Sequence, residues 1–176
     1  MSFPVDEFGI NQRVEAKCYN LGFSPAKHLA SILRRSDEEV TIMTYALPAQ
    51  EWYLPKALDI RTEGVTIIAH TNFATQALEL KRKYPALRIF LDPRVHAKMT
   101  LTSGGQIWIG SANLCLSHSL DGTIGLESPA MYAYLMDEIQ RYHLTDPSKE
   151  VTLDFDDYYA GEHSSTEPDF TGMEDE

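Results

Sequence analysis

The stretch RVHAKMTLTSGGQIWIGSAN, from Arg94 to Asn113, contains two polar pairs with the same spacing inside otherwise strand-like sequence. In the first pair, His96 and Lys98 are two residues apart, so a strand's period of two would place both side chains on one face. In the second pair, Ser111 and Asn113 are also two residues apart, and they follow the next apolar run. Both pairs therefore suggest side chains gathered on one surface.

A hairpin would bring the two pairs together. The runs 95–102 and 107–109 predict two strands, and Ser103-Gly104-Gly105 between them is typical of a tight turn. An imidazole, an ammonium group, a hydroxyl and a carboxamide are then expected to converge. This set of groups predicts a phosphate-binding site that contains a nucleophile.

Each residue type suits phosphoryl chemistry. The neutral imidazole of His96 can attack phosphorus and form a phosphohistidine, which divides one displacement into two easier ones. Lys98 and the Asn113 amide can donate to the non-bridging oxygens and stabilise their charge without a metal. Glu127 lies in a later strand-like run and is expected to accept the second ring N–H of His96. A second histidine is needed as general acid, and the chain has no second His-x-Lys pair.

The remaining sequence predicts strands that alternate with helices. A helix is expected to begin at Ser24-Pro25, with serine as N-cap and proline at the first helical position, and to end near Ser36. Hydrophobic patterns and turn residues predict strands at 40–47, 65–69, 87–91 and 123–126, and helices at 50–60, 72–83 and 131–142. This order predicts an α/β fold with a mixed central sheet flanked by helices on both faces.

Length and composition limit the class of protein. The 176 residues, 43% of them hydrophobic, suffice for one domain. We expect this domain at 24–145, after an irregular or extended arm at 1–23 and before an acidic, largely disordered tail at 146–176. The sequence has neither a membrane-length apolar run nor a signal-peptide pattern, so we expect a cytoplasmic protein without stable membrane association. Cys18 and Cys115 show no metal-ligand spacing and are expected to be buried free thiols.

The net charge of −11 is concentrated near the C-terminus. Ten of the 26 acidic residues lie from Glu150 onward, where there is no Lys or Arg, and the preceding residues hold 16 acidic and 15 basic residues. The body of the chain is therefore almost neutral and compatible with a polyanionic partner. The tail is expected to be a solubilising end. The alternative is that it competes with a polyanionic substrate for the site.

The pattern His-x-Lys followed by Gly-Ser-x-Asn resembles the HKD motif of the phospholipase D superfamily, especially its short single-motif nucleases. The resemblance implies a phospholipase D-like domain in which His96 is the nucleophile and Lys98 and Asn113 bind phosphate. It also implies that Ser111 assists and that Glu127 orients the histidine. In such nucleases a symmetric dimer places two motif histidines face to face. A homodimer is therefore implied, with the second His96 as general acid and with no metal or other cofactor.

Three further positions bear on this interpretation. The family pattern has aspartate five residues after the lysine, where this sequence has Ser103, and this change puts the level of activity in doubt. Arg94, two residues before His96, is a further candidate for binding substrate. His70, at the end of a predicted strand, is expected to be structural, and the alternative is that it lines the cleft.

Together, these features predict a metal-independent phosphodiesterase, namely an endonuclease that acts on DNA or RNA. The small size, the single motif and the lack of an interfacial amphipathic helix favour nucleic acid over lipid. Two alternatives remain. One is a catalytically silent domain that binds nucleic acid or a protein partner. The other is a phospholipid phosphodiesterase.

Overall fold

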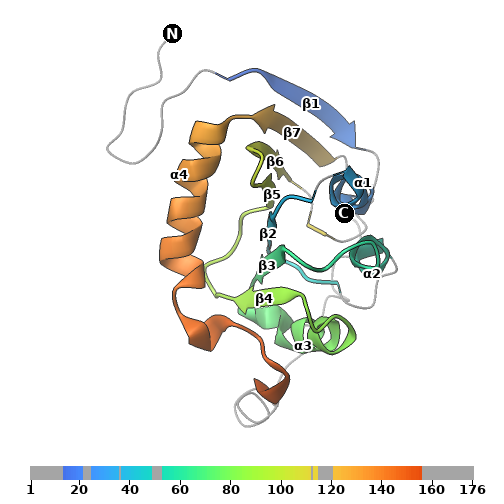
Figure 1. Cartoon of the computed structure of the whole chain (residues 1–176), viewed down its shortest axis with the longest axis vertical. Coiled ribbons are helices and arrows are strands. Elements are labelled where there is room, and N and C mark those ends of the chain that lie inside the picture. The colour runs from blue at the N-terminus through green and yellow to red at the C-terminus, as the bar shows by residue number, and fades with distance from the viewer. Residues whose placement is uncertain are drawn as a thin grey trace, which may run out of the picture.

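The computed structural model describes residues 14–21, 25–35, 37–48, 53–111, 113–114 and 121–155. Within these residues a seven-stranded mixed sheet has the order β1-β7-β6-β5-β2-β3-β4 (Figure 1). The strands are β1 (Ala16–Leu21), β2 (Val40–Thr44), β3 (Val65–Ala69), β4 (Arg88–Leu91), β5 (Met99–Thr102), β6 (Gln106–Gly110) and β7 (Asp121–Glu127).

Helices cover both faces of this sheet, as the sequence predicted. The main helices are α1 (Pro25–Arg35), α2 (Tyr53–Leu58), α3 (Ala74–Lys83) and α4 (Pro129–Ile139). Figure 1 shows α1, α2 and α3 on one side of the sheet and α4 on the other. A 3-10 turn (Thr71–Phe73) precedes α3, and a π-helical turn (Gln140–Leu144) continues α4. None of the helices in the described ranges combines the length and the hydropathy that a transmembrane segment needs.

Two hydrophobic cores follow from the alternation of side chains along the central strands. Ile67 packs in the core beneath α1, α2 and α3, and the adjacent Ile68 packs in the core beneath α4. Both side chains are fully buried, and burying an aliphatic side chain of this size contributes about 1.5–3 kcal/mol. The apolar sequence of these strands is explained by helices on both faces, because neither face of the central strands meets solvent.

Strand direction determines which residues meet at each end of the sheet. Strands β2, β3 and β4 are parallel, and β5 pairs antiparallel to β2, with Val40 opposite Thr102 and Met43 opposite Met99. The carboxyl ends of the parallel strands therefore lie beside the start of β5. Because β6 runs antiparallel to β5, the end of β6 lies there too.

The β5–β6 hairpin forms at the predicted turn. Gly105 has a φ of +87°, which favours glycine, and its amide donates to the Thr102 carbonyl at 2.9 Å. An added Cβ at Gly105 would lie 3.1 Å from the backbone of Pro129, at the first turn of α4. Glycine is thus required both by the turn and by the approach of α4.

Several element boundaries differ from the prediction. Helix α4 begins at Pro129, because the Ser128 hydroxyl accepts from the Met131 amide and caps it. Helix α3 begins at Ala74 and not at residue 72, because Nδ1 of His70 accepts from the Asn72 amide at 3.1 Å and a 3-10 turn comes first.

The flanking segments are more ordered than expected where the structure describes them. Residues 16–21 of the expected arm form β1 at the edge of the sheet, paired with β7. In the expected tail, Val151 is fully buried and its amide donates to the Ile89 carbonyl at 2.8 Å. Cys18 is an exposed free thiol, which corrects the expectation of burial, and Cys115 lies outside the described residues. Residues 1–13 and 156–176 of the arm and tail also lie outside them.

Candidate active site

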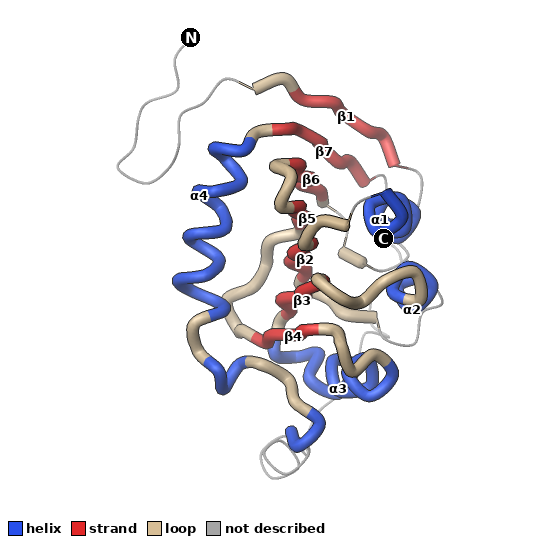
Figure 2. The backbone as a smooth tube through the Cα atoms, viewed as in Figure 1, coloured by secondary structure: helices blue, strands red, loops and turns tan. Residues whose placement is uncertain are grey.

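His96 and Lys98 lie in a loop and not in the strand that the sequence predicted. Strand β5 begins only at Met99, and residues 92–98 have no ladder of strand hydrogen bonds. This loop must run from β4, at one edge, past β3 and β2 to reach β5, and Figure 2 shows it between the sheet and α4. Val95 is buried in the core beneath α4, whereas the neighbouring His96 is exposed. The argument from strand periodicity was therefore wrong for this pair.

The hairpin nevertheless brings the two halves of the motif to one end of the sheet. The Gly110 amide donates to the Lys98 carbonyl at 3.0 Å, so the end of β6 lies against the lysine. The Lys98 ammonium donates to the His96 carbonyl at 3.2 Å, which ties the two residues together. Ser111 follows directly after Gly110, and its hydroxyl accepts from the Gly122 amide at 3.2 Å.

Asn113 is fixed by the loop that follows β2. Its Oδ1 accepts from the Ala46 amide at 3.3 Å. This bond directs the carboxamide so that its NH₂ group is left as the donor for a ligand. The side chain is half-buried, and the neighbouring Leu114 is buried. Asn113 is thus anchored at the same end of the sheet as Lys98 and Ser111.

The structure places Glu127 at the opposite end of the sheet, which corrects its predicted role. In the β6–β7 pairing, Gly110 lies opposite Thr123, whereas Glu127 lies opposite Gln106, beside the hairpin turn. Four residues along a strand correspond to about 13 Å. Glu127 therefore cannot contact the imidazole of its own chain. The ring of His96 lies beside that of Tyr45, with the two centroids 5.4 Å apart.

Ser103, the departure from the motif, also lies at this opposite end. Its hydroxyl accepts from the Glu39 amide at 3.2 Å, and its own amide donates to the Glu39 carbonyl at 3.0 Å. The side chain therefore ties the hairpin turn to the start of β2. Because Ser103 is remote from His96, serine in place of the motif aspartate removes no group from the end of the sheet that holds His96, Lys98 and Asn113.

A buried carboxylate next to the motif, Asp92, was missed by the sequence interpretation. Asp92 is fully buried and accepts hydrogen bonds from Arg94 (Nε at 3.0 Å and Nη2 at 2.8 Å), Lys149 (2.6 Å) and His143 (3.0 Å). Burial alone would raise the pKa of Asp92, but the hydrogen bonds from these three partners hold it well below its usual range. The carboxylate is thus ionised and central to a charge cluster.

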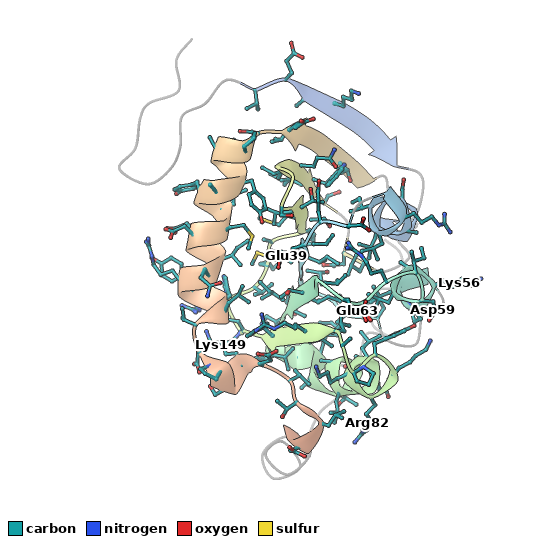
Figure 3. All side chains as sticks on the ribbon, in the orientation of Figure 1. Glu39, Lys56, Asp59, Glu63, Arg82 and Lys149 are labelled. Atoms are coloured by element: carbon teal, nitrogen blue, oxygen red, sulfur yellow. The ribbon has the colours of Figure 1, made fainter. Side chains whose placement is uncertain are left out.

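This cluster also shows what Arg94 contacts within the chain. Besides Asp92, its guanidinium donates to the Tyr142 carbonyl at 2.7 Å, and the Lys149 ammonium donates to the same carbonyl at 3.1 Å. Figure 3 shows Lys149 beside the β4 edge of the sheet. Asp92 and its partners therefore anchor the start of the His96 loop to the C-terminal segment.

Comparisons with known proteins show which solved structures share this fold. No family model matches the chain, and no curated protein matches its sequence. NucT from Helicobacter pylori matches in structure with a TM-score of 0.59 and 15% identity, over 73% of this chain and 95% of that one. Nuc from Salmonella typhimurium, a phospholipase D family member, matches with a TM-score of 0.54 and 10% identity, over 73% and 93%. Phosphatidylserine synthase from Haemophilus influenzae matches with a TM-score of 0.59 and 13% identity, over 78% and 38%. The chain has the fold of the phospholipase D superfamily.

Proposed function

We propose that this chain is a metal-independent phosphodiesterase that cleaves DNA or RNA through a phosphohistidine on His96, in an active site shared by two copies. One observation carries the proposal. The β5–β6 hairpin brings the His-x-Lys and Gly-Ser-x-Asn segments to the end of the sheet where the parallel strands also terminate. Ligands of open α/β sheets bind at the carboxyl ends of the strands.

The first step transfers the phosphoryl group to the protein. A ring nitrogen of His96 attacks phosphorus, a P–N bond forms, and the P–O bond to the leaving group breaks. The leaving oxygen takes a proton from the imidazolium of the second copy's histidine. Lys98 and the NH₂ group of Asn113 donate to the non-bridging oxygens, where negative charge grows in the transition state.

The second step restores the protein. Water attacks the phosphohistidine, and its proton passes to the histidine of the second copy, which became neutral in the first step. The P–N bond breaks, and a phosphomonoester leaves while His96 returns to its neutral form. Each histidine ends in its starting protonation state, so the two steps together consume one water molecule and need no other reactant.

The extent of the structural matches agrees with the motif's resemblance to short single-motif nucleases, and this resemblance favours nucleic acid over lipid as substrate. The chain covers 95% of NucT and 93% of Nuc but only 38% of the phosphatidylserine synthase. It therefore resembles the whole of the two short proteins and a part of the synthase. Ser103, the departure from the family motif, lies at the end of the sheet opposite His96, so it does not favour the catalytically silent alternative.

Cleavage in EDTA tests the proposed chemistry. Labelled single- and double-stranded DNA, RNA, a generic phosphate bis-ester and phospholipid vesicles would be incubated with wild type, His96→Ala and Glu127→Gln. We expect EDTA-resistant cleavage of nucleic acid that is lost in His96→Ala and kept in Glu127→Gln, since Glu127 lies far from the site. Cleavage that EDTA abolishes, or no cleavage by a dimeric preparation, would contradict the proposal. Release of lipid head groups alone would move the substrate to phospholipid.

Mixing wild type with His96→Ala tests the shared site. If two histidines form one site, only dimers of two wild-type copies are active, and they make up about a quarter of the dimers in an equal mixture after subunit exchange. The mixture then keeps about a quarter of the activity of pure wild type at the same total protein concentration. Independent sites would instead keep about half. A linear decline of activity with the mutant fraction would therefore reject the shared site.

A further inference from the structure

The loop after β2 contacts both halves of the motif. The Thr44 hydroxyl donates to the Ala46 carbonyl at 2.9 Å and accepts from the Leu114 amide at 3.4 Å. The Ala46 amide donates to Oδ1 of Asn113 at 3.3 Å. The backbone on both sides of Tyr45 is therefore held against the Gly-Ser-x-Asn segment.

The side chain of Tyr45 reaches the other half of the motif. Its ring centroid lies 5.4 Å from that of the His96 imidazole, with the planes tilted by 50°. Both the separation and the tilt fall in the range that favours contact between aromatic rings. Tyr45 thus connects Asn113, through the adjacent Ala46 amide, to His96, through its ring.

Neighbouring rings fix Tyr45 from other directions. The His70 ring lies 4.8 Å from it, and the Phe73 ring packs edge-on at 5.7 Å and 81°. The His70 amide donates to the Tyr45 carbonyl at 3.4 Å, and Nδ1 of His70 accepts from the Asn72 amide. Phe73 itself packs against the core beneath α1, α2 and α3. The Tyr45 ring is therefore a fixed surface, whereas His96 is exposed in a loop.

We propose that Tyr45 is a positioning residue. Its ring holds the imidazole of His96 in the orientation from which the imidazole attacks phosphorus. The role rests on the function proposed above and is the one that the sequence had assigned to Glu127. An exposed histidine without such a contact would distribute among several rotamers. The reaction rate depends strongly on the position of the attacking group, and a displacement of about 1 Å can cost on the order of 100-fold in rate. The contact is therefore expected to affect kcat more than substrate binding.

Kinetics of Tyr45 variants provide the first test. In Tyr45→Ala we expect kcat to fall about 10-fold or more with KM within about two-fold, because orientation and not affinity is lost. Tyr45→Phe keeps the ring and is expected to stay within about two-fold of wild type in both constants. Tyr134→Ala is the matched control, since this tyrosine lies on α4 and the residue is 37% exposed. It should leave kcat unchanged.

Nuclear magnetic resonance gives a second readout that needs no substrate. The His96 imidazole signals are identified by their loss in His96→Ala. In wild type they should carry the ring-current shift of Tyr45, which Tyr45→Phe keeps and Tyr45→Ala removes. This measurement decides the orientation of His96 even if the chain cleaves nothing, so failure of the proposed function and failure of the present inference are distinguishable.

Three results would overturn the inference. The His96 signals could be unchanged in Tyr45→Ala, the kinetic effect of Tyr45→Ala could be confined to a rise in KM, or kcat could fall in Tyr45→Phe as much as in Tyr45→Ala. A rise in KM alone would make Tyr45 a substrate contact. An equal fall of kcat in Tyr45→Phe would assign the effect to the hydroxyl. Tyr45→Leu, which fills the space without an aromatic ring, replaces Tyr45→Ala if the latter unfolds. It should show the same loss of kcat and of the ring-current shift.

Discussion

Replacing Asp92 with asparagine removes the charge from the buried carboxylate at the start of the His96 loop while keeping its shape. Asp92 is fully buried, and its partners Lys149 and His143 have side chains only 20% and 15% exposed. Removing one member of a buried ion pair costs about 3–5 kcal/mol. The third partner, Arg94, is 58% exposed, so solvent screens its share. We therefore expect a loss of about 3 kcal/mol at pH 7, at the lower end of that range.

The loss should depend on pH in a defined direction. The pKa of Asp92 is lowered in the folded protein from its ordinary value of 3.8. The stabilisation is thus fully present above that value and is lost as the pH falls below it, because the unfolded chain then takes up a proton that the folded chain does not. The difference between wild type and Asp92→Asn should shrink by about 1.4 kcal/mol for each pH unit below the ordinary pKa.

Urea unfolding of both proteins at pH 7 and at several values between pH 5 and 3 measures these quantities. Thermal unfolding at pH 7 should show a midpoint lower by about 6–12 °C in the variant. Asp137→Asn is the matched control, because Asp137 pairs with Arg141 on the surface and is 66% exposed. It should change stability by less than about 0.5 kcal/mol. An Asp92→Asn protein as stable as wild type, or a difference that stays constant down to pH 3, would refute the reasoning.

Three further substitutions probe other parts of the fold. Ser103→Ala should lower stability by about 1 kcal/mol, because the Glu39 amide loses its acceptor, and should leave cleavage unchanged; a 10-fold loss of kcat/KM would contradict this. Glu127→Gln should keep kcat within about two-fold across the pH profile, since Glu127 lies at the far end of β7; a shifted profile would restore its predicted role. Gly105→Ala should lower the unfolding free energy by about 1–3 kcal/mol through its positive φ and the contact with Pro129; an unfolding midpoint equal to wild type would contradict this.

Local sequence patterns predicted most of the architecture. The apolar runs at 65–69 and 87–91 predicted the neighbouring strands β3 and β4, and Ser103-Gly104-Gly105 predicted the hairpin turn. These features are determined by residues close together in the chain, so periodicity and turn chemistry reveal them. The same patterns were sufficient to predict that the two halves of the motif meet.

Long-range pairing accounts for what the sequence interpretation missed. Asp92 and Lys149 are 57 residues apart, and no sequence pattern around either residue predicts the ion pair. Tyr45 reaches the motif only because β2 lies next to β5 in the sheet. The error over Glu127 was avoidable, since an antiparallel partner of β6 that ends at residue 127 must carry that residue away from Gly110. A one-dimensional spacing cannot substitute for strand direction.

The most direct test of the central claim is to search for phosphate bound to His96. Wild type would be mixed in EDTA with a bis-ester that has a good leaving group, quenched within the first turnover and digested for mass spectrometry. If His96 is the nucleophile, the peptide that contains it carries an acid-labile phosphoryl ester adduct, and leaving-group release shows a burst that scales with the concentration of active sites. Metal-dependent turnover without a burst and without an adduct on His96 would contradict the account.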